Sequence, residues 1–126
     1  MQDYKKLKVW EKAHAFTLAV YQITAQFPRH EQYGLASQLQ RCSSSVPSNI
    51  VEGCGLNSNK ELLRHLHIAM GSAKEAEYQL LLAKDLGYIT PATHALLDEQ
   101  VNEVERMLSA LINTIKRGEP QGRTRE

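Results

Sequence analysis

Residue types that often serve in catalysis occur in this chain, but their spacings do not build an active site. His65 and His67 stand two apart, and on a helix such side chains point about 200° away from each other, so they cannot share one metal ion. His65 could chelate a metal together with Glu61 at i, i+4, although a single pair of this kind is more often a solvated contact. The pattern therefore predicts neither a metal site nor a cofactor.

Cys42 is followed by three serines, Ser43 to Ser45, which would suit a nucleophile only if a base stood at a suitable spacing. No such base is recognisable, and small residues before Pro47 also suit a closely packed, kinked helix. The sequence motifs of phosphate-binding loops, zinc proteases and serine hydrolases are missing as well. We therefore favour packing over catalysis and predict no catalytic residue. An enzyme or metal site that uses His65 or the Cys42 region is the least favoured alternative.

A polar stripe runs beside the apolar stripe of the segment that follows residue 32, and a similar stripe runs along the segment that follows residue 59. Residues at such flanking positions of a helical bundle are half buried, and an unpaired buried charge costs on the order of several kcal/mol. We expect Arg41 to pair with Glu75 or Glu52, within one subunit or across a subunit interface. An ordinary hydrated bundle face is the alternative. The predicted polar network or interface comprises Gln38, Arg41, Ser45, Asn49, Glu52, Ser72 and Glu75, with Gln79 beside it.

Helices are the elements that must position these residues. The first helix is predicted over about residues 9–27, because apolar residues recur there at spacings of three and four until Pro28. The second is predicted from about Gln32 to Gly53. Pro47 lies inside this second helix and predicts a kink or a break near Ser43 to Val46. The expected apolar face comprises Trp10, Ala13, Phe16, Val20, Ile23 and Phe27 in the first helix, and Leu35, Leu39, Cys42, Val46 and Ile50 in the second.

Two further helices have clear start and stop signals. Ser58 and Glu61 form a capping-box pattern, and Gly87 suits a left-handed cap at the end of the third helix. Thr90 followed by Pro91 predicts the start of the fourth helix, which continues to Gly118. The short connection between them requires antiparallel neighbours. The expected seams are Leu62, Leu66, Ala69, Ala73, Ala76, Leu80 and Ala83, and then Leu97, Val101, Val104, Leu108, Leu111 and Ile115.

These elements predict an all-α protein, an antiparallel up-and-down four-helix bundle over residues 1–117, with a disordered C-terminal tail over residues 118–126. A length of 126 residues with 42% hydrophobic content suffices for one core without disulfides or metals. The chain has no apolar run of membrane-spanning length and no signal-peptide pattern at its N-terminus, so a cytoplasmic protein with no membrane contact is expected. In that reducing compartment Cys42 and Cys54 should be free thiols.

The formal net charge of +1 is not typical of a nucleic-acid-binding protein, but the charges are unevenly distributed along the sequence. Lys and Arg exceed Asp and Glu in residues 1–64, whereas acids dominate residues 75–105. A polyanion would therefore have to approach the N-terminal half. The candidate nucleic-acid contacts are Lys5, Lys6, Lys8, Lys12, Arg29, Lys60 and Arg64.

Three blocks of sequence make the chain resemble a known family. They are Tyr4-Lys5-Lys6-Leu7-Lys8-Val9-Trp10, Tyr33-Gly34-Leu35 with Ser37-Gln38-Leu39, and Val46-Pro47-Ser48-Asn49-Ile50-Val51-Glu52-Gly53. The likeness continues through Ile68-Ala69-Met70-Gly71-Ser72 and Asp85-Leu86-Gly87-Tyr88-Ile89, and it covers about residues 4 to 117 in order. The chain thus resembles the four-helix-bundle proteins encoded in intervening sequences of bacterial 23S rRNA genes.

This resemblance implies an up-and-down bundle that assembles into a ring of five subunits, and it implies no catalytic residues. A related accessory protein of diversity-generating retroelements uses such a ring to bind nucleic acid and a reverse transcriptase. Two positions depart from the family pattern, because Gln40 and Leu56 stand where a basic residue is usual. Both changes remove positive charge, which lowers the expected affinity for RNA.

The leading functional hypothesis is a non-enzymatic, self-assembling helical-bundle scaffold, a homo-oligomer and by resemblance a pentamer, with RNA or a nucleoprotein as its partner. A ring would present Lys5, Lys6, Lys8 and Lys12 in several copies, which raises avidity. The alternative is a protein-binding adaptor that acts through its acidic face, residues 75–105, without nucleic acid.

Overall fold

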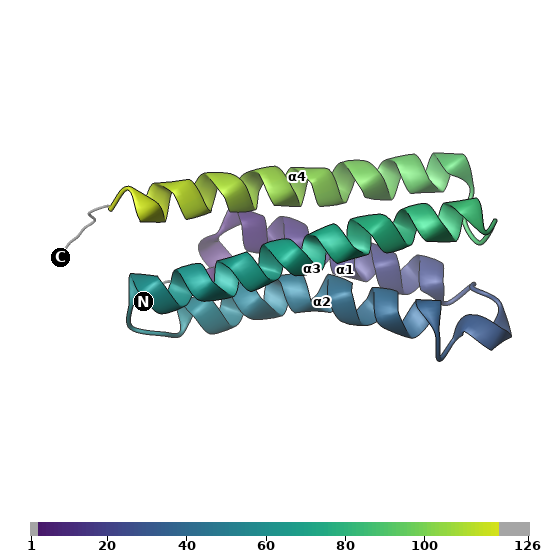
Figure 1. Cartoon of the computed structure of the whole chain (residues 1–126), viewed down its shortest axis with the longest axis horizontal. Coiled ribbons are helices and arrows are strands. Elements are labelled where there is room, and N and C mark those ends of the chain that lie inside the picture. Colours follow the sequence, from purple (N-terminus) through teal and green to yellow (C-terminus); the bar gives the residue numbers. More distant parts are fainter. Residues whose placement is uncertain (1–2, 119–126) are drawn as a thin grey trace.

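The computed structural model describes residues 3–118, and these residues form a bundle of four long helices (Figure 1). A short 3-10 helix, η1 (Tyr4–Lys6), precedes α1 (Lys8–Thr24), and a second short 3-10 helix, η2 (Arg29–Glu31), leads into α2 (Leu35–Cys54). The long helices α3 (Asn59–Asp85) and α4 (Pro91–Lys116) complete the chain. The predicted all-α class is therefore confirmed. The tail beyond residue 118, which was expected to be disordered, lies outside the described residues.

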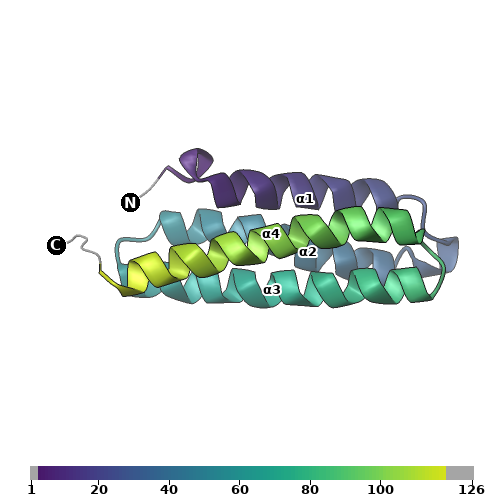
Figure 2. The same ribbon diagram turned by 90° about the horizontal axis from the view of Figure 1, so that it is seen from above.

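The helices run up and down in sequence order. α1 packs against α2 and α4, and α3 packs against the same two helices, so α1 and α3 occupy diagonal corners. The chain start, the α2–α3 connection and the end of α4 lie at one end of the bundle, and the α3–α4 connection lies at the other (Figure 2). None of the helices in residues 3–118 combines the length and the apolar character that crossing a membrane requires.

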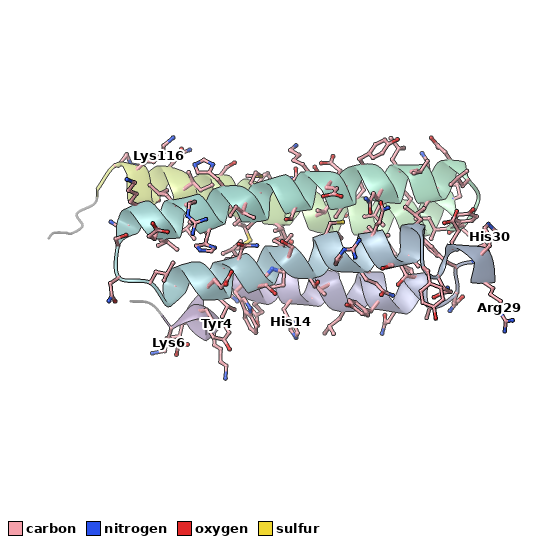
Figure 3. All side chains as sticks on the ribbon, turned by 60° about the horizontal axis from the view of Figure 1, so that its bottom comes forward. Tyr4, Lys6, His14, Arg29, His30 and Lys116 are labelled. Carbon is pink, nitrogen blue, oxygen red and sulfur yellow. The ribbon has the colours of Figure 1, made fainter. Side chains whose placement is uncertain are left out.

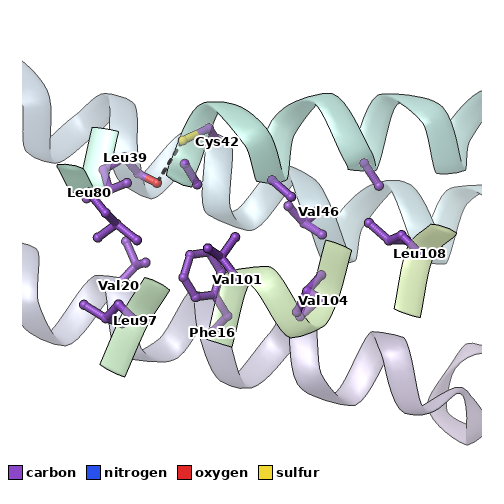
Figure 4. Close-up of a cluster of buried hydrophobic side chains, with 14 of the residues drawn as sticks. Phe16, Val20, Leu39, Cys42, Val46, Leu80, Leu97, Val101, Val104 and Leu108 are labelled. Atoms are coloured by element: carbon purple, nitrogen blue, oxygen red, sulfur yellow. Dashed lines mark hydrogen bonds between the residues drawn. The ribbon is translucent and has the colours of Figure 1, made fainter. Parts of the chain in front are cut away.

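The core is a continuous apolar cluster to which all four helices contribute (Figure 4). Phe16 and Val20 from α1 meet Leu39 and Val46 from α2 there, and their side chains are fully buried. The α3 seam is buried from Leu62 to Ala83 as expected, and four of its members are alanines, which permit close helix approach.

Two details of the predicted seams change. In α4 the buried residue after Leu108 is Ile112, whereas Leu111 and Ile115 are only half-buried. A straight helix with 3.6 residues per turn drifts by about 20° per heptad against a strict seven-residue seam, which shifts the buried position at the helix end. In α1 Trp10 and Ile23 are half-buried, whereas Val9 and Thr24 are buried.

The helix boundaries largely follow the sequence signals. The Ser58 hydroxyl accepts the Glu61 amide N–H at 3.1 Å, and the Thr90 hydroxyl accepts the Thr93 amide N–H at 3.1 Å. Gly87 has φ +81°, and the amide of Tyr88 closes the end of α3 by donating to the Ala83 carbonyl at 2.9 Å.

The predicted bounds of the first two helices were wrong by about one turn. α1 ends at Thr24 instead of residue 27, and α2 begins at Leu35 instead of Gln32. The Gln32 side chain stabilises the earlier end of α1, because its amide donates to the carbonyls of Thr24 at 3.2 Å and Phe27 at 2.9 Å. It therefore caps the end of α1 from the connecting loop.

Pro47 does not break α2, which continues without interruption through Cys54. A proline lacks the N–H that would bond to the carbonyl four residues earlier, and in this helix that carbonyl belongs to Ser43. The Thr17 hydroxyl on α1 donates to the Ser43 carbonyl at 3.0 Å and replaces the missing donor. The neighbouring helix α1 thus supplies a donor to the carbonyl that the proline leaves without one, and the predicted break does not occur.

Candidate interaction surfaces

The polar stripes of α2 and α3 face each other and form two hydrogen-bonded clusters, which we together call the polar network. The Ser72 hydroxyl donates to the Ser45 hydroxyl at 2.8 Å across the two helices. The Gln79 amide donates both to the Gln38 carbonyl oxygen and to the Glu75 carboxylate, each at 3.2 Å. These contacts form because side chains that flank two packed apolar seams meet at the helix boundary.

The Ser45–Ser72 cluster continues through Asn49, whose side-chain amide donates to the Ser45 hydroxyl at 3.0 Å, to the buried His65. His65 Nδ1 lies 2.9 Å from the Asn49 side-chain oxygen, and His65 Nε2 lies 3.2 Å from Nη2 of Arg64. Arginine can only donate, so Nε2 accepts and Nδ1–H donates to Asn49. The Glu52 carboxylate lies 3.7 Å from the same Nδ1.

His65 and Glu61, which the sequence offered as a disfavoured chelating pair, do not contact each other in the described residues. Glu61 instead binds the Nε atom of Arg64 at 3.0 Å. Within residues 3–118 no group of three His, Cys, Asp or Glu side chains is placed to hold a metal ion.

A groove of about 520 Å³ opens above this network, lined by Gln38, Arg41, Cys42, Ser45, Ser72 and Glu75. Arg41 is exposed and forms no ion pair with any residue from 3 to 118. The Glu75 carboxylate is held by the Gln79 amide alone in that part of the chain. The expected pairing of Arg41 with Glu75 or Glu52 is therefore not formed within the described subunit, and both charges of the groove remain available.

Cys42 lies at the floor of the groove but is chemically passive. Burial, and then the nearby Glu75 carboxylate, raise the pKa of its thiol to about 12. A thiol with so high a pKa carries almost no thiolate near neutral pH. The hydroxyls of Ser43 and Ser44 donate to backbone carbonyls of their own helix, and Ser45 belongs to the network. These contacts agree with the packing interpretation of the Cys42 region.

Gly53 lets α2 approach α3 closely at the end of this face. A Cβ atom at position 53 would lie 2.9 Å from Cδ1 of Leu62 and 3.1 Å from Cβ of His65. Because such distances are shorter than ordinary van der Waals contacts, a glycine is needed at this crossing. The end of the Val46 to Gly53 block thus has a structural role in the bundle.

Most of the candidate basic residues gather at one end of the bundle. Lys5 and Lys6 lie in η1, Lys8 and Lys12 at the start of α1, and Lys60 and Arg64 at the start of α3. These starts share an end of the bundle with the end of α4, where Lys116 and Arg117 add two cations that sequence reasoning missed (Figures 2 and 3). Arg29, by contrast, lies at the opposite end (Figure 3).

Acidic neighbours already neutralise some of these cations. Lys8 binds Glu11 at 3.5 Å, and Lys12 binds Glu103 of α4 at 3.6 Å. Together with Arg64, which binds Glu61, they are less available to a polyanion. We define the cations of this end that form no ion pair within residues 3–118 as the basic end, which comprises Lys5, Lys6, Lys60, Lys116 and Arg117.

The acidic segment 75–105 does not form one continuous acidic face. Glu77 and Glu105 both contact Lys74, at 3.6 and 3.0 Å, and Glu103 binds Lys12. Glu105 is only 7% exposed. Its burial, and then the neighbouring Glu77 carboxyl, raise its pKa although Lys74 acts in the opposite sense. Several of the acids therefore serve contacts within the bundle.

An aromatic cluster beside the basic end was missed by the sequence reasoning. The Tyr4 ring meets Trp10 edge-on with centroids 5.0 Å apart, and His14 stacks on Trp10 at 5.1 Å with an interplanar angle of 5°. Trp10 had been assigned to the core and His14 had no assigned partner. The i, i+4 spacing of Trp10 and His14 was the available signal, because such side chains are neighbours on a helix surface.

The fold and these surfaces define the class of protein: an antiparallel four-helix bundle with a polar groove between two helices and a cationic end. The sequence profile of the family described as 23S rRNA-intervening sequence protein matches residues 5–110, and the chain belongs to this family. A search of curated proteins found no significant match.

A solved structure has the same fold. It is the crystal structure of a protein of unknown function from the S23 ribosomal protein family of Bacteroides thetaiotaomicron, with a TM-score of 0.79 and 24% sequence identity. The match covers 84% of this chain and 96% of the other. The four-helix bundle expected from the sequence resemblance is thus confirmed, while neither the family nor this neighbour indicates an enzymatic activity.

Proposed function

We propose that this protein is a non-enzymatic scaffold that assembles with copies of itself and binds RNA, alone or within a nucleoprotein, at its basic end. Self-assembly is supported by the α2–α3 groove, because Arg41 and Glu75 both line this groove but form no ion pair with each other. If Arg41 of one copy met Glu75 of another, both charges would gain a partner that the described subunit does not provide.

The surface around the groove also has the composition of an interface. α2 has 20 residues, of which only Arg41 and Glu52 are charged. On α3, Ile68 and Tyr78 are 40% and 60% exposed, and with Glu75 between them they lie on one helix face. Interface cores are depleted in charged residues and enriched in tyrosine. This face is therefore better suited to a second protein surface than to water.

Light scattering on the purified chain tests the assembly. By family resemblance the expected particle is a ring with five times the 14.2 kDa mass of the chain. Arg41→Glu should shift it toward monomer, because it places two acids at the contact, and the double variant Arg41→Glu with Glu75→Arg should restore the oligomer. Arg106→Glu, on exposed α4 surface, serves as a control. A wild-type monomer would overturn the assembly.

The basic end supports the RNA part of the proposal, because lysines without internal partners can neutralise phosphates at little cost. Fluorescence anisotropy with a labelled RNA should show binding that weakens steeply as salt rises. Lys5→Gln with Lys6→Gln should weaken it, whereas Arg29→Gln, at the far end, should leave it unchanged. If the RNA does not bind even at low salt, the RNA-binding part of the proposal is wrong. Pull-downs that survive nuclease treatment would then favour a protein-binding adaptor.

A further inference from the structure

The aromatic cluster formed by Tyr4, Trp10 and His14 has an unused stacking surface. One face of the His14 ring lies on Trp10, nearly parallel, and His14 is exposed. Its exposed area must therefore lie on the ring edge and the opposite face. Within residues 3–118 no other aromatic ring contacts His14, and its ring nitrogens form no hydrogen bond.

Packing explains Trp10 and Tyr4 but not His14. Tyr4 and Trp10 both pack against the core, and their edge-on contact ties η1 to the first turns of α1. His14 lies one turn further along α1 and is exposed. It adds a flat, polarisable ring that stacks on the indole of Trp10, and His14 itself lies at the surface of the bundle (Figure 3).

Cations without an ion pair in residues 3–118 lie next to Tyr4, the ring of this aromatic cluster that meets Trp10 edge-on. The Nζ atom of Lys5 lies 6.0 Å from the centroid of the Tyr4 ring, and Lys6 follows in the same turn. Neither lysine forms an ion pair within the described chain. Aromatic rings next to cations that track a phosphate backbone are the two components of sites for single-stranded nucleic acid.

We infer that the open face of His14 receives an unpaired base of single-stranded RNA, while Lys5 and Lys6 bind the adjoining phosphates. This inference rests on the RNA binding proposed above and specifies its substrate class. A base in a duplex cannot stack on a protein ring, because its neighbours cover both of its faces. The site should therefore select single strands, loops or ends over paired RNA. None of the described residues that line the groove proposed for assembly belongs to α1, so the stack is not part of that groove.

The test compares a 12-nucleotide oligouridine and oligoadenine with an RNA duplex of the same length, at low and moderate salt, using the full chain. His14→Ala should weaken single-strand binding about tenfold, since stacking on one ring is worth that much. His14→Phe keeps a flat ring and should retain the affinity. His67→Ala removes another exposed histidine, on α3, and is the matched control. Trp10 is the only tryptophan, so its emission reports binding at this place.

Tighter binding of single strands, with changed Trp10 emission and a loss confined to His14→Ala, would support the inference. If RNA binds in a salt-dependent way but His14→Ala behaves like His67→Ala, or the duplex binds equally well, the stacking site is overturned while RNA binding stands. If neither oligonucleotide nor duplex binds at low salt, both proposals fall. Circular dichroism of each variant checks that the bundle is intact.

Discussion

The contact between Thr17 and the Ser43 carbonyl should be one of the most sensitive points of the bundle. Pro47 cannot donate to that carbonyl, and the Thr17 hydroxyl supplies a donor from α1 at 3.0 Å. Thr17→Val keeps the branched shape and removes only the hydroxyl. The Ser43 carbonyl would then lack its donor in a region where Thr17 is 8% exposed and Ser43 is fully buried.

A buried acceptor left without a donor costs about 1–3 kcal/mol. We therefore expect Thr17→Val to lower the free energy of unfolding by about 2 kcal/mol and the melting temperature by roughly 5–10 °C for a chain of this size. The Thr17 hydroxyl also lies 3.0 Å from the Ala13 carbonyl, four residues earlier in its own helix. Thr114→Val is the matched control, because Thr114 donates to the carbonyl four residues earlier, at 2.9 Å, but has no cross-helix acceptor among the described residues and is exposed on α4. Its removal should cost less than about 0.5 kcal/mol.

A double-mutant cycle separates this contact from general packing effects. Pro47→Ala restores an N–H that can bond to the Ser43 carbonyl within α2, so the Thr17 hydroxyl becomes less necessary. Urea unfolding followed by circular dichroism should show that Thr17→Val costs at least about 1 kcal/mol less in the Pro47→Ala background. An equal cost in both backgrounds, or a cost no larger than that of Thr114→Val, would refute the reasoning.

Three further predictions follow from the same contacts. Burial raises the pKa of Cys42 to about 12 and also raises the pKa of Cys54. Neither thiol should therefore react with a thiol reagent at pH 8 until the protein is unfolded. Rapid labelling of either cysteine in the folded protein would contradict this prediction. Glu105→Gln should raise the melting temperature by roughly 3 °C at neutral pH, because the raised pKa of Glu105 shows that its ionised form is disfavoured in the folded state. The gain should shrink as the pH falls toward the ordinary carboxyl value of 4.5, where folded and unfolded chains both carry the proton, and a gain independent of pH would exclude this cause. Gly71→Ala, with open space around the added Cβ, should stabilise α3 by up to about 1 kcal/mol. Gly53→Ala should instead destabilise the bundle by about 1 kcal/mol, because its Cβ would contact Leu62. Chemical denaturation of the two variants measures both effects, and equal effects would disprove the close approach at Gly53.

Local sequence signals were sufficient for the helices and for the side of each helix that is buried. The seam from Leu62 to Ala83, the Ser58 and Thr90 caps and the left-handed Gly87 all act within a few residues of chain, so they can be read without the partner helices. The same periodicity placed Ser45 and Ser72 beside the apolar seams and hence at a shared boundary.

The tertiary structure decided how these helices register along their axes. Only this register brings Thr17 opposite the carbonyl that Pro47 orphans, places the Asn49 side chain against His65, and leaves Arg41 without an ion pair in residues 3–118. The up-and-down topology, by contrast, is sufficient to gather lysines from η1 and the starts of α1 and α3 at one end and to separate them from Arg29, and the sequence had predicted that topology. Periodicity specifies the direction in which a side chain points around its helix, but not its height beside a neighbour. That height depends on the packing of all four helices together, because interdigitating side chains fix each helix against the next.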